Sequence, residues 1–122
     1  MDSIQRNEEI MHPITIADHI WLEPTLLGMT LNYSEGPQGL HFRVGMNLRS
    51  IKEAAQALQD ARFVWAIRDG SFSFFGDDDQ LVLTFTAGQQ PVHRQFVLKG
   101  REVDEFKQAI GIFREAAIPR LN

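Results

Sequence analysis

The sequence predicts an α+β domain in which a mainly antiparallel sheet of about six to seven strands is packed by two helices. Three runs of alternating apolar and polar side chains, separated by turn residues, occupy residues 63–86, and a fourth follows at residues 92–98. Two stretches with helical spacing, residues 50–60 and 102–117, each follow a group of strands. The expected order is therefore βββα-ββββα, with the C-terminal helix the longer.

The chain has 122 residues, the size of one domain. Residues 1–12 are polar and have no period, so we expect a mobile N-terminal arm followed by a single domain over residues 13–122. The absence of cysteine excludes thiol catalysis, cysteine zinc sites and disulfides. No stretch reaches the roughly 18 apolar residues of a membrane span, and the N-terminus lacks a signal-peptide pattern. We expect a cytoplasmic protein without a membrane partner.

The first half of the chain is expected to contain three strands. Residues 14–24 are rich in β-branched and aromatic side chains and predict one strand, bent near Ala17-Asp18. Residues 26–33 predict the second strand. Residues 40–45 predict the third, because apolar and polar side chains alternate there, and a turn rich in glycine precedes it.

Each group of strands is followed by a predicted helix. The first begins near Ser50, because Ser50 and Glu53 have the spacing of a capping box, and it ends near Asp60. The second covers residues 102–117 and is ended by Pro119. A strand group followed by a helix thus occurs twice, a pattern that duplication or simple strand-turn-helix order could produce.

The central stretch, residues 63–86, predicts a three-stranded meander. Asp69-Gly70 favours a two-residue type I′ turn, which places Ile67 opposite Phe72 and Trp65 opposite Phe74. A second turn through residues 76–79 then places Leu81 opposite Phe74 and Leu83 opposite Phe72. One face of the meander, expected to pack against the terminal helix, comprises Trp65, Ile67, Phe72, Phe74, Leu81 and Leu83.

The opposite face of the same meander carries almost no charge. An uncharged and partly apolar sheet face is usually covered. Burial within the domain is the favoured interpretation, and contact with a second copy or a partner protein is the alternative. This face comprises Val64, Ala66, Ser73, Phe75, Val82 and Thr84.

The net charge of −4 is distributed unevenly. Residues 1–40 carry one basic and six acidic side chains, a net charge of −5, and the remainder carries +1. Because duplex nucleic acid and anionic lipid are attracted by a positive field, the acidic total argues against both as general partners. A local basic strip is still compatible with it.

Residues that could carry chemistry form no recognisable motif. The four histidines, His12, His19, His41 and His93, lie in different segments without metal-ligand spacing, and His19 beside Asp18 is at most an isolated candidate base. The run Asp77-Asp78-Asp79 lacks the pattern of a calcium loop and predicts a solvated turn. We therefore expect no enzyme activity, no metal and no cofactor.

Two functions are compatible with these features. The first is a small acidic protein-binding module of the immunity-protein, chaperone or adaptor type, which binds a protein partner or self-associates as a dimer. Its candidate contact residues are Val64, Ser73, Phe75, Val82 and Thr84. The alternative is a single-stranded nucleic-acid-binding protein, because aromatic and basic side chains on a twisted sheet can stack and hold bases. Its candidate residues are Arg43, Arg68, Arg94, Lys99 and Arg101.

Overall fold

The structure, a computed structural model, describes residues 12–88 and 92–121. These residues form two antiparallel sheets of four strands each and two helices, so the α+β class and the longer C-terminal helix are confirmed, whereas a single sheet of six to seven strands was only approximate. The predicted arm lies outside the described ranges except for His12. The elements are β1 (Ile14–Ala17), β2 (Ile20–Thr25), β3 (Gly28–Ser34), β4 (His41–Asn47), α2 (Leu48–Ala57), β5 (Phe63–Ala66), β6 (Phe72–Gly76), β7 (Gln80–Ala87), β8 (Val92–Lys99) and α3 (Arg101–Leu121).

The first sheet has one strand more than predicted, because residues 14–24 form a hairpin instead of one bent strand. The chain reverses between Ala17 and Ile20, which are paired, and Ile14 lies opposite Leu22. This hairpin turns the apolar side chains of both strands toward one core, where Ile20 and Leu22 are fully buried. The order is therefore ββββα-ββββα, with each sheet a simple meander from its first to its fourth strand.

The first turn of the second sheet keeps the predicted pairing but has a different form. Trp65 lies opposite Phe74, and the Ile67 N–H donates to the Phe72 carbonyl at 2.9 Å. Among the described residues only glycines have positive φ, so Asp69 cannot occupy a type I′ turn and Gly70, at φ 80°, alone takes that conformation. The loop consequently contains four residues instead of two.

The second turn is centred one residue further along the chain than predicted, and this changes the register by two residues. Phe74 lies opposite Leu83 rather than Leu81, and Phe72 lies opposite Phe85 rather than Leu83. The Asp77 N–H donates to the Gln80 carbonyl at 2.9 Å, which closes the turn immediately after Gly76. Because side chains alternate with a period of two, this displacement leaves both predicted faces intact.

The two helices also differ from prediction at their ends. The N-cap of α2 is Asn47, whose side chain accepts a hydrogen bond from the Ser50 N–H at 2.9 Å, so Ser50 lies inside the first turn and does not cap it. Helix α3 continues past Pro119 to Leu121. Neither helix in the described part of the chain is long and apolar enough to cross a membrane.

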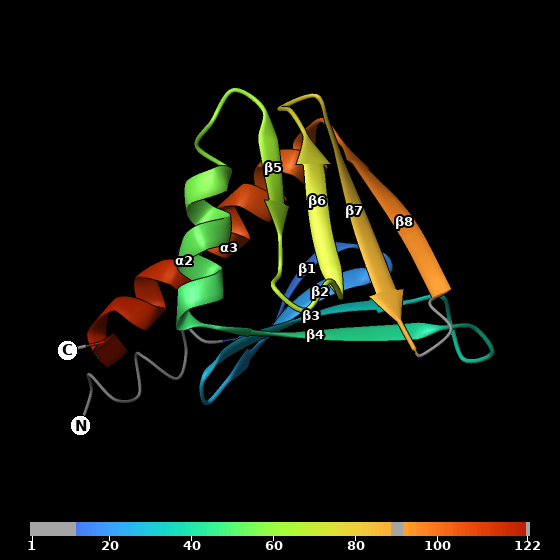
Figure 1. The fold of residues 1–122 in the computed structure, drawn as a ribbon, viewed down its shortest axis with the longest axis horizontal. Helices are drawn as coiled ribbons and strands as arrows, with labels where there is room; N and C mark the ends of the chain where they lie inside the picture. The colour runs from blue at the N-terminus through green and yellow to red at the C-terminus, as the bar shows by residue number, and fades with distance from the viewer. Residues whose placement is uncertain (1–11, 89–91, 122) are drawn as a thin grey trace.

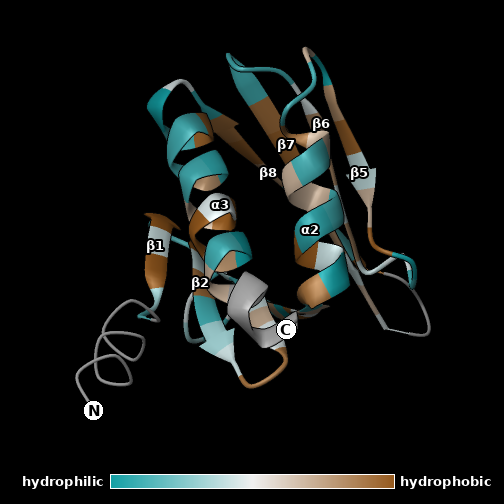
Figure 2. Ribbon diagram, turned by 90° about the vertical axis from the view of Figure 1, so that its left-hand side faces the viewer, coloured by the Kyte–Doolittle hydropathy of each residue, from teal (hydrophilic) through white to brown (hydrophobic). Residues whose placement is uncertain are grey.

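The core lies between the inner faces of the sheets and the two helices. Figure 1 shows the sheets at a steep angle, with α2 and α3 on the same side of β5–β8, and Figure 2 shows both helices in front of that sheet. The Phe106 ring of α3 packs edge-on against Phe74, at 6.1 Å between centroids. Where the sheets meet, the Tyr33 ring stacks on Phe85 at 5.3 Å. The inner, core-facing side of β5–β8 is thus fixed by contacts with the first half of the chain and with α3.

Candidate functional site

The side of β5–β8 turned away from both helices is called the outer face here, and it carries an apolar row across all four strands. The register pairs Val64 with Phe75, Phe75 with Val82, and Val82 with Val97. Cross-strand neighbours on one face lie side by side. Four apolar side chains from four strands therefore form one continuous row, called the apolar row.

Three of the four side chains in the apolar row are accessible to solvent. Val64 is 73% exposed, Phe75 51% and Val97 38%, whereas Val82, enclosed between its neighbours, is 9% exposed. Figure 1 shows no described helix or strand over this side of the sheet. The expectation that the domain itself buries this face was therefore wrong, because both helices pack on the other side.

A polar row runs beside the apolar row. Ala66 pairs with Ser73, Ser73 with Thr84, and Thr84 with Gln95. The Gln95 amide donates to the Thr84 hydroxyl at 3.4 Å. Strands β5–β8 contain no Asp or Glu in an otherwise acidic chain. The outer face thus presents mainly apolar and hydroxyl groups, with Lys99 at the end of β8 as its charged side chain.

Five predicted contact residues, Val64, Ser73, Phe75, Val82 and Thr84, therefore lie together on this face. Sequence reasoning missed Val97, although it lies on the opposite side of its strand from Phe96 and Leu98, which pack inward. The alternation of β8 was the available signal, because it separates Val97 from the core-facing positions. Val97 extends the row to the last strand of the sheet.

The five basic residues of the alternative function are distributed over several surfaces. Arg43 is exposed on β4 of the first sheet, and Arg68 lies in the β5–β6 turn. Lys99, at the end of β8, pairs with Gln80, and both positions belong to the outer face. Arg94 lies opposite Phe85, on the inner, core-facing side of the same strand. The structure therefore places these side chains on different faces.

Two of these basic residues are engaged in ion pairs. Arg94 Nε lies 3.0 Å from Glu35 Oε2, and Arg101 Nε lies 3.1 Å from Glu105 Oε1. Glu35 Oε2 also accepts a hydrogen bond from the Tyr33 hydroxyl at 3.1 Å. Desolvation is the largest influence on Glu35 and raises its pKa, but hydrogen bonds from the Leu40 N–H, Tyr33 and Arg94, with the Arg94 charge, together lower the pKa below its usual value.

The Asp77–Asp79 run forms a turn, as expected of aspartates with local hydrogen bonding. Asp77 Oδ1 accepts from the N–H groups of Asp79 and Gln80 at 2.9 and 3.1 Å. Asp78 pairs with Lys107 Nζ of α3 at 2.9 Å, and the same ammonium lies 5.0 Å from the centre of the Phe63 ring. These contacts anchor the turn to α3.

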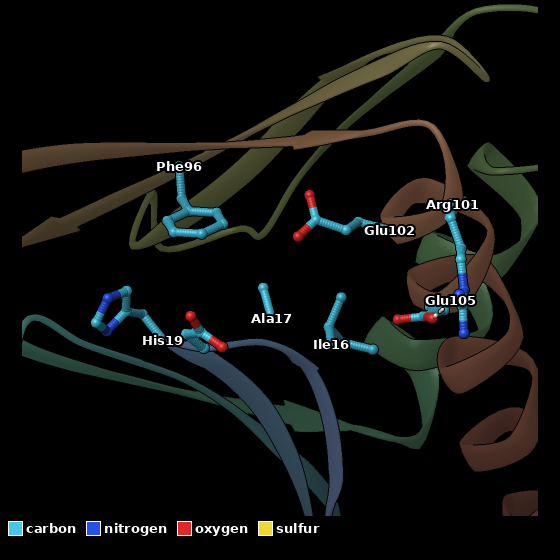
Figure 3. Close-up of a pocket in the computed structure, with 8 residues that line it drawn as sticks. Ile16, Ala17, His19, Phe96, Arg101, Glu102 and Glu105 are labelled. Atoms are coloured by element: carbon cyan, nitrogen blue, oxygen red, sulfur yellow. Dashed lines mark hydrogen bonds and ion pairs between the residues drawn. The ribbon is translucent and has the colours of Figure 1, made fainter.

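A hollow of about 430 Å³ opens between the β1–β2 turn, β8 and the first turn of α3. Figure 3 shows the Phe96 ring and the Glu102 carboxylate pointing into this gap, with His19 at one end. The rings of His19 and Phe96 are edge-on at 6.5 Å. The hollow combines an apolar floor with several carboxylates, but no three His, Asp or Glu side chains of the described residues are close enough to hold a metal ion.

The remaining histidines are not gathered into one site. His93 Nδ1 lies 2.8 Å from the Thr86 hydroxyl on the outer face, and His41 is exposed on β4. Asp18 and His19 form the β1–β2 turn, and no hydrogen bond joins their side chains within the described part of the chain.

Comparison with protein-family models, with curated proteins and with solved structures gives no match. Any functional conclusion must therefore come from these surfaces.

Proposed function

We propose that this chain is a small non-enzymatic protein-binding module that contacts its partner through the outer face of β5–β8. The apolar row carries the proposal, because Val64, Phe75 and Val97 expose apolar area on one ordered face and Val82 joins them across β7. Contiguous exposed apolar side chains on an ordered surface mark interaction sites more often than scattered ones do.

The arrangement of the outer face supports this function. Its apolar row is flanked by the hydroxyl groups of Ser73 and Thr84 and by Lys99 at the rim, so an apolar strip borders groups that can hydrogen-bond. The absence of acidic side chains from these strands reduces repulsion toward an acidic partner or a second copy of this acidic chain.

The size of the outer face limits what it can bind by itself. Four strands about 4.8 Å apart, with at most eight residues rising about 3.4 Å each, give a face of roughly 500 Å². A stable interface commonly buries about 800 Å² on each partner. A partner that also contacts the rim of the sheet would bind better than one that contacts the outer face alone.

A cytoplasmic location and a role of the immunity-protein, chaperone or adaptor type are parts of the same proposal.

The test replaces Val64 and Phe75 together by glutamate and uses Ile112→Glu as the matched control, since Ile112 is 42% exposed on α3. Proteins captured from the native cell by the wild-type chain are purified and titrated against each variant, and self-association is measured by sedimentation velocity. We expect the double variant to lose binding at least about tenfold while its circular dichroism is unchanged, because two charges would be buried without partners. Equal binding by wild type and double variant would refute the proposal.

Single-stranded nucleic acid is tested in the same experiment. A labelled oligonucleotide is titrated at low and high salt, because phosphate contacts give a strong salt dependence. We expect no salt-sensitive binding, since the basic side chains lie on different faces and Arg94 and Arg101 are paired with carboxylates. Salt-sensitive binding that is lost on replacing Arg43 and Lys99 would favour the alternative function.

A further inference from the structure

Strand β5 is an edge strand whose outward backbone groups can be identified from the register. The Ile67 N–H donates to the Phe72 carbonyl, so Ile67 and Phe72 form a hydrogen-bonded pair. In an antiparallel ladder such pairs alternate along the strand, which makes Trp65 and Phe74 the next one. The N–H and C=O groups of Val64 and Ala66 therefore point away from β6, toward the free edge.

The two edges of this sheet differ in how their backbone groups are satisfied. On the free edge of β8, the Lys99 N–H donates to Glu102 Oε1 at 3.2 Å, and the His93 carbonyl accepts from Arg94 Nη1 at 3.0 Å. Over residues 12–88 and 92–121, no hydrogen bond reaches the outward groups of Val64 or Ala66. The β5 edge is thus available for pairing with another strand, whereas side chains partly cover the β8 edge.

Two basic residues bracket the β5 edge. Arg62 and Arg68 are both exposed, and neither belongs to an ion pair within the described part of the chain. If a second copy paired antiparallel with most overlap, Arg62 of one chain would lie opposite Arg68 of the other. Like charges directly opposite are unfavourable. The charges therefore disfavour self-pairing and favour a strand with carboxylates near its ends.

We propose that the free edge of β5 binds an extended, acidic segment of a partner protein as a fifth strand of the β5–β8 sheet. The backbone groups of Val64 and Ala66 supply up to four hydrogen bonds, and Arg62 and Arg68 pair with carboxylates of the segment. Every second side chain of the added strand lies beside Val64 on the outer face, which continues the apolar row. This inference rests on the proposed function and names the part of the partner that binds at the rim.

The test selects binders from a random library of linear decapeptides displayed on phage, with the 122-residue chain as the target. Selected peptides are synthesised and titrated against the wild-type chain, Ala66→Pro and the double variant Arg62→Glu with Arg68→Glu. Proline at position 66 removes an outward N–H, not a ladder hydrogen bond, and edge strands tolerate proline. Ala66→Ser is the matched control because it keeps the N–H, and thermal unfolding verifies the fold of each variant.

We expect peptides rich in Asp or Glu with alternating apolar residues, bound at least about fivefold more weakly by Ala66→Pro and by the double variant, and normally by Ala66→Ser. Amide hydrogen exchange at Val64 and Ala66 should slow on binding, whereas exchange at Trp65, whose N–H points toward β6, should not change. A selection without enriched peptides, or peptides that bind all variants equally, would overturn the inference. Either result leaves the effect of Val64→Glu with Phe75→Glu on partner binding as a separate test of the outer face.

Discussion

Arg94 and Glu35 connect the two halves of this protein across 59 positions of sequence, with Arg94 Nε 3.0 Å from Glu35 Oε2. Glu35 follows β3 of the first sheet, and Arg94 lies on β8, the last strand of the second. The same carboxylate oxygen accepts from the Tyr33 hydroxyl, whose ring stacks on Phe85. A polar contact therefore closes one end of the aromatic cluster between the sheets.

The single tyrosine of the chain reports directly on this contact. Burial, followed by the hydrogen bond to Glu35 and the Glu35 charge, raises the pKa of Tyr33 above its usual value near 10. Glu35→Gln removes the charge, so we expect the Tyr33 pKa to decrease from its wild-type value. Absorbance at 295 nm against pH measures this change. An unchanged titration in Glu35→Gln would contradict the contact.

The same carboxylate predicts how stability depends on acid. Because the folded pKa of Glu35 is lowered, its contribution to stability is present above the unfolded value, about 4.3, and is lost as the pH falls through the folded pKa. We expect wild type to have a higher urea midpoint than Glu35→Gln at pH 7, with the difference decreasing below pH 4. A difference that is the same at pH 7 and pH 3 would contradict the assignment.

Phe74 and Phe75 are adjacent in sequence but lie on opposite faces of β6. Phe74 is 1% exposed against Phe106, whereas Phe75 is 51% exposed on the outer face. Phe74→Ala should lower the free energy of unfolding by about 3–5 kcal/mol through lost burial and a cavity. Phe75→Ala should lower it by less than about 1 kcal/mol. Urea denaturation of the two variants decides this, and equal losses would show that the outer face is part of the core.

The N-cap of α2 is Asn47 in the structure, whereas the sequence pattern predicted Ser50. Asn47→Ala removes the acceptor of the Ser50 N–H and should lower the free energy of unfolding by about 1 kcal/mol. Ser50→Ala, the matched control, should change it by less than about 0.5 kcal/mol, because the Ser50 hydroxyl makes no hydrogen bond within the described residues. Chemical denaturation compares them. A larger loss of unfolding free energy for Ser50→Ala than for Asn47→Ala would support the predicted capping box at Ser50.

Two glycines of the second sheet should respond differently to alanine. At Gly76, φ is 150° and an added Cβ would lie 2.1 Å from the Gln80 carbonyl oxygen, a backbone atom that cannot move away freely. At Gly70, φ is 80° and no atom other than those of Gly70 and its two chain neighbours lies within 4 Å of the added Cβ. Gly70→Ala should cost about 1–2 kcal/mol from its backbone conformation alone, and Gly76→Ala should cost more. Thermal unfolding that ranks them in reverse would contradict the β6–β7 turn.

Turn geometry could not be predicted from the sequence as well as strand faces could. The faces of β5–β7 follow from a period of two, so a register change of two residues left Phe74 inside and Phe75 outside. The register itself depended on which residues close the second turn, here Asp77 and Gln80, and the composition of the turn does not specify them. The extra hairpin at Ala17–Ile20 was missed for the same reason: residues 14–24 are apolar on both sides of an unremarkable turn.

By itself the sequence determined the α+β class, the alternation of each strand and the uncharged character of one side of β5–β7, because these are local properties of side-chain order. Only the tertiary structure decided that the strands divide into two sheets, that both helices pack on one side of the second, and that Val97 completes the exposed apolar row. It also paired Arg94 with Glu35. These outcomes depend on contacts between segments far apart in the chain, which no local pattern encodes.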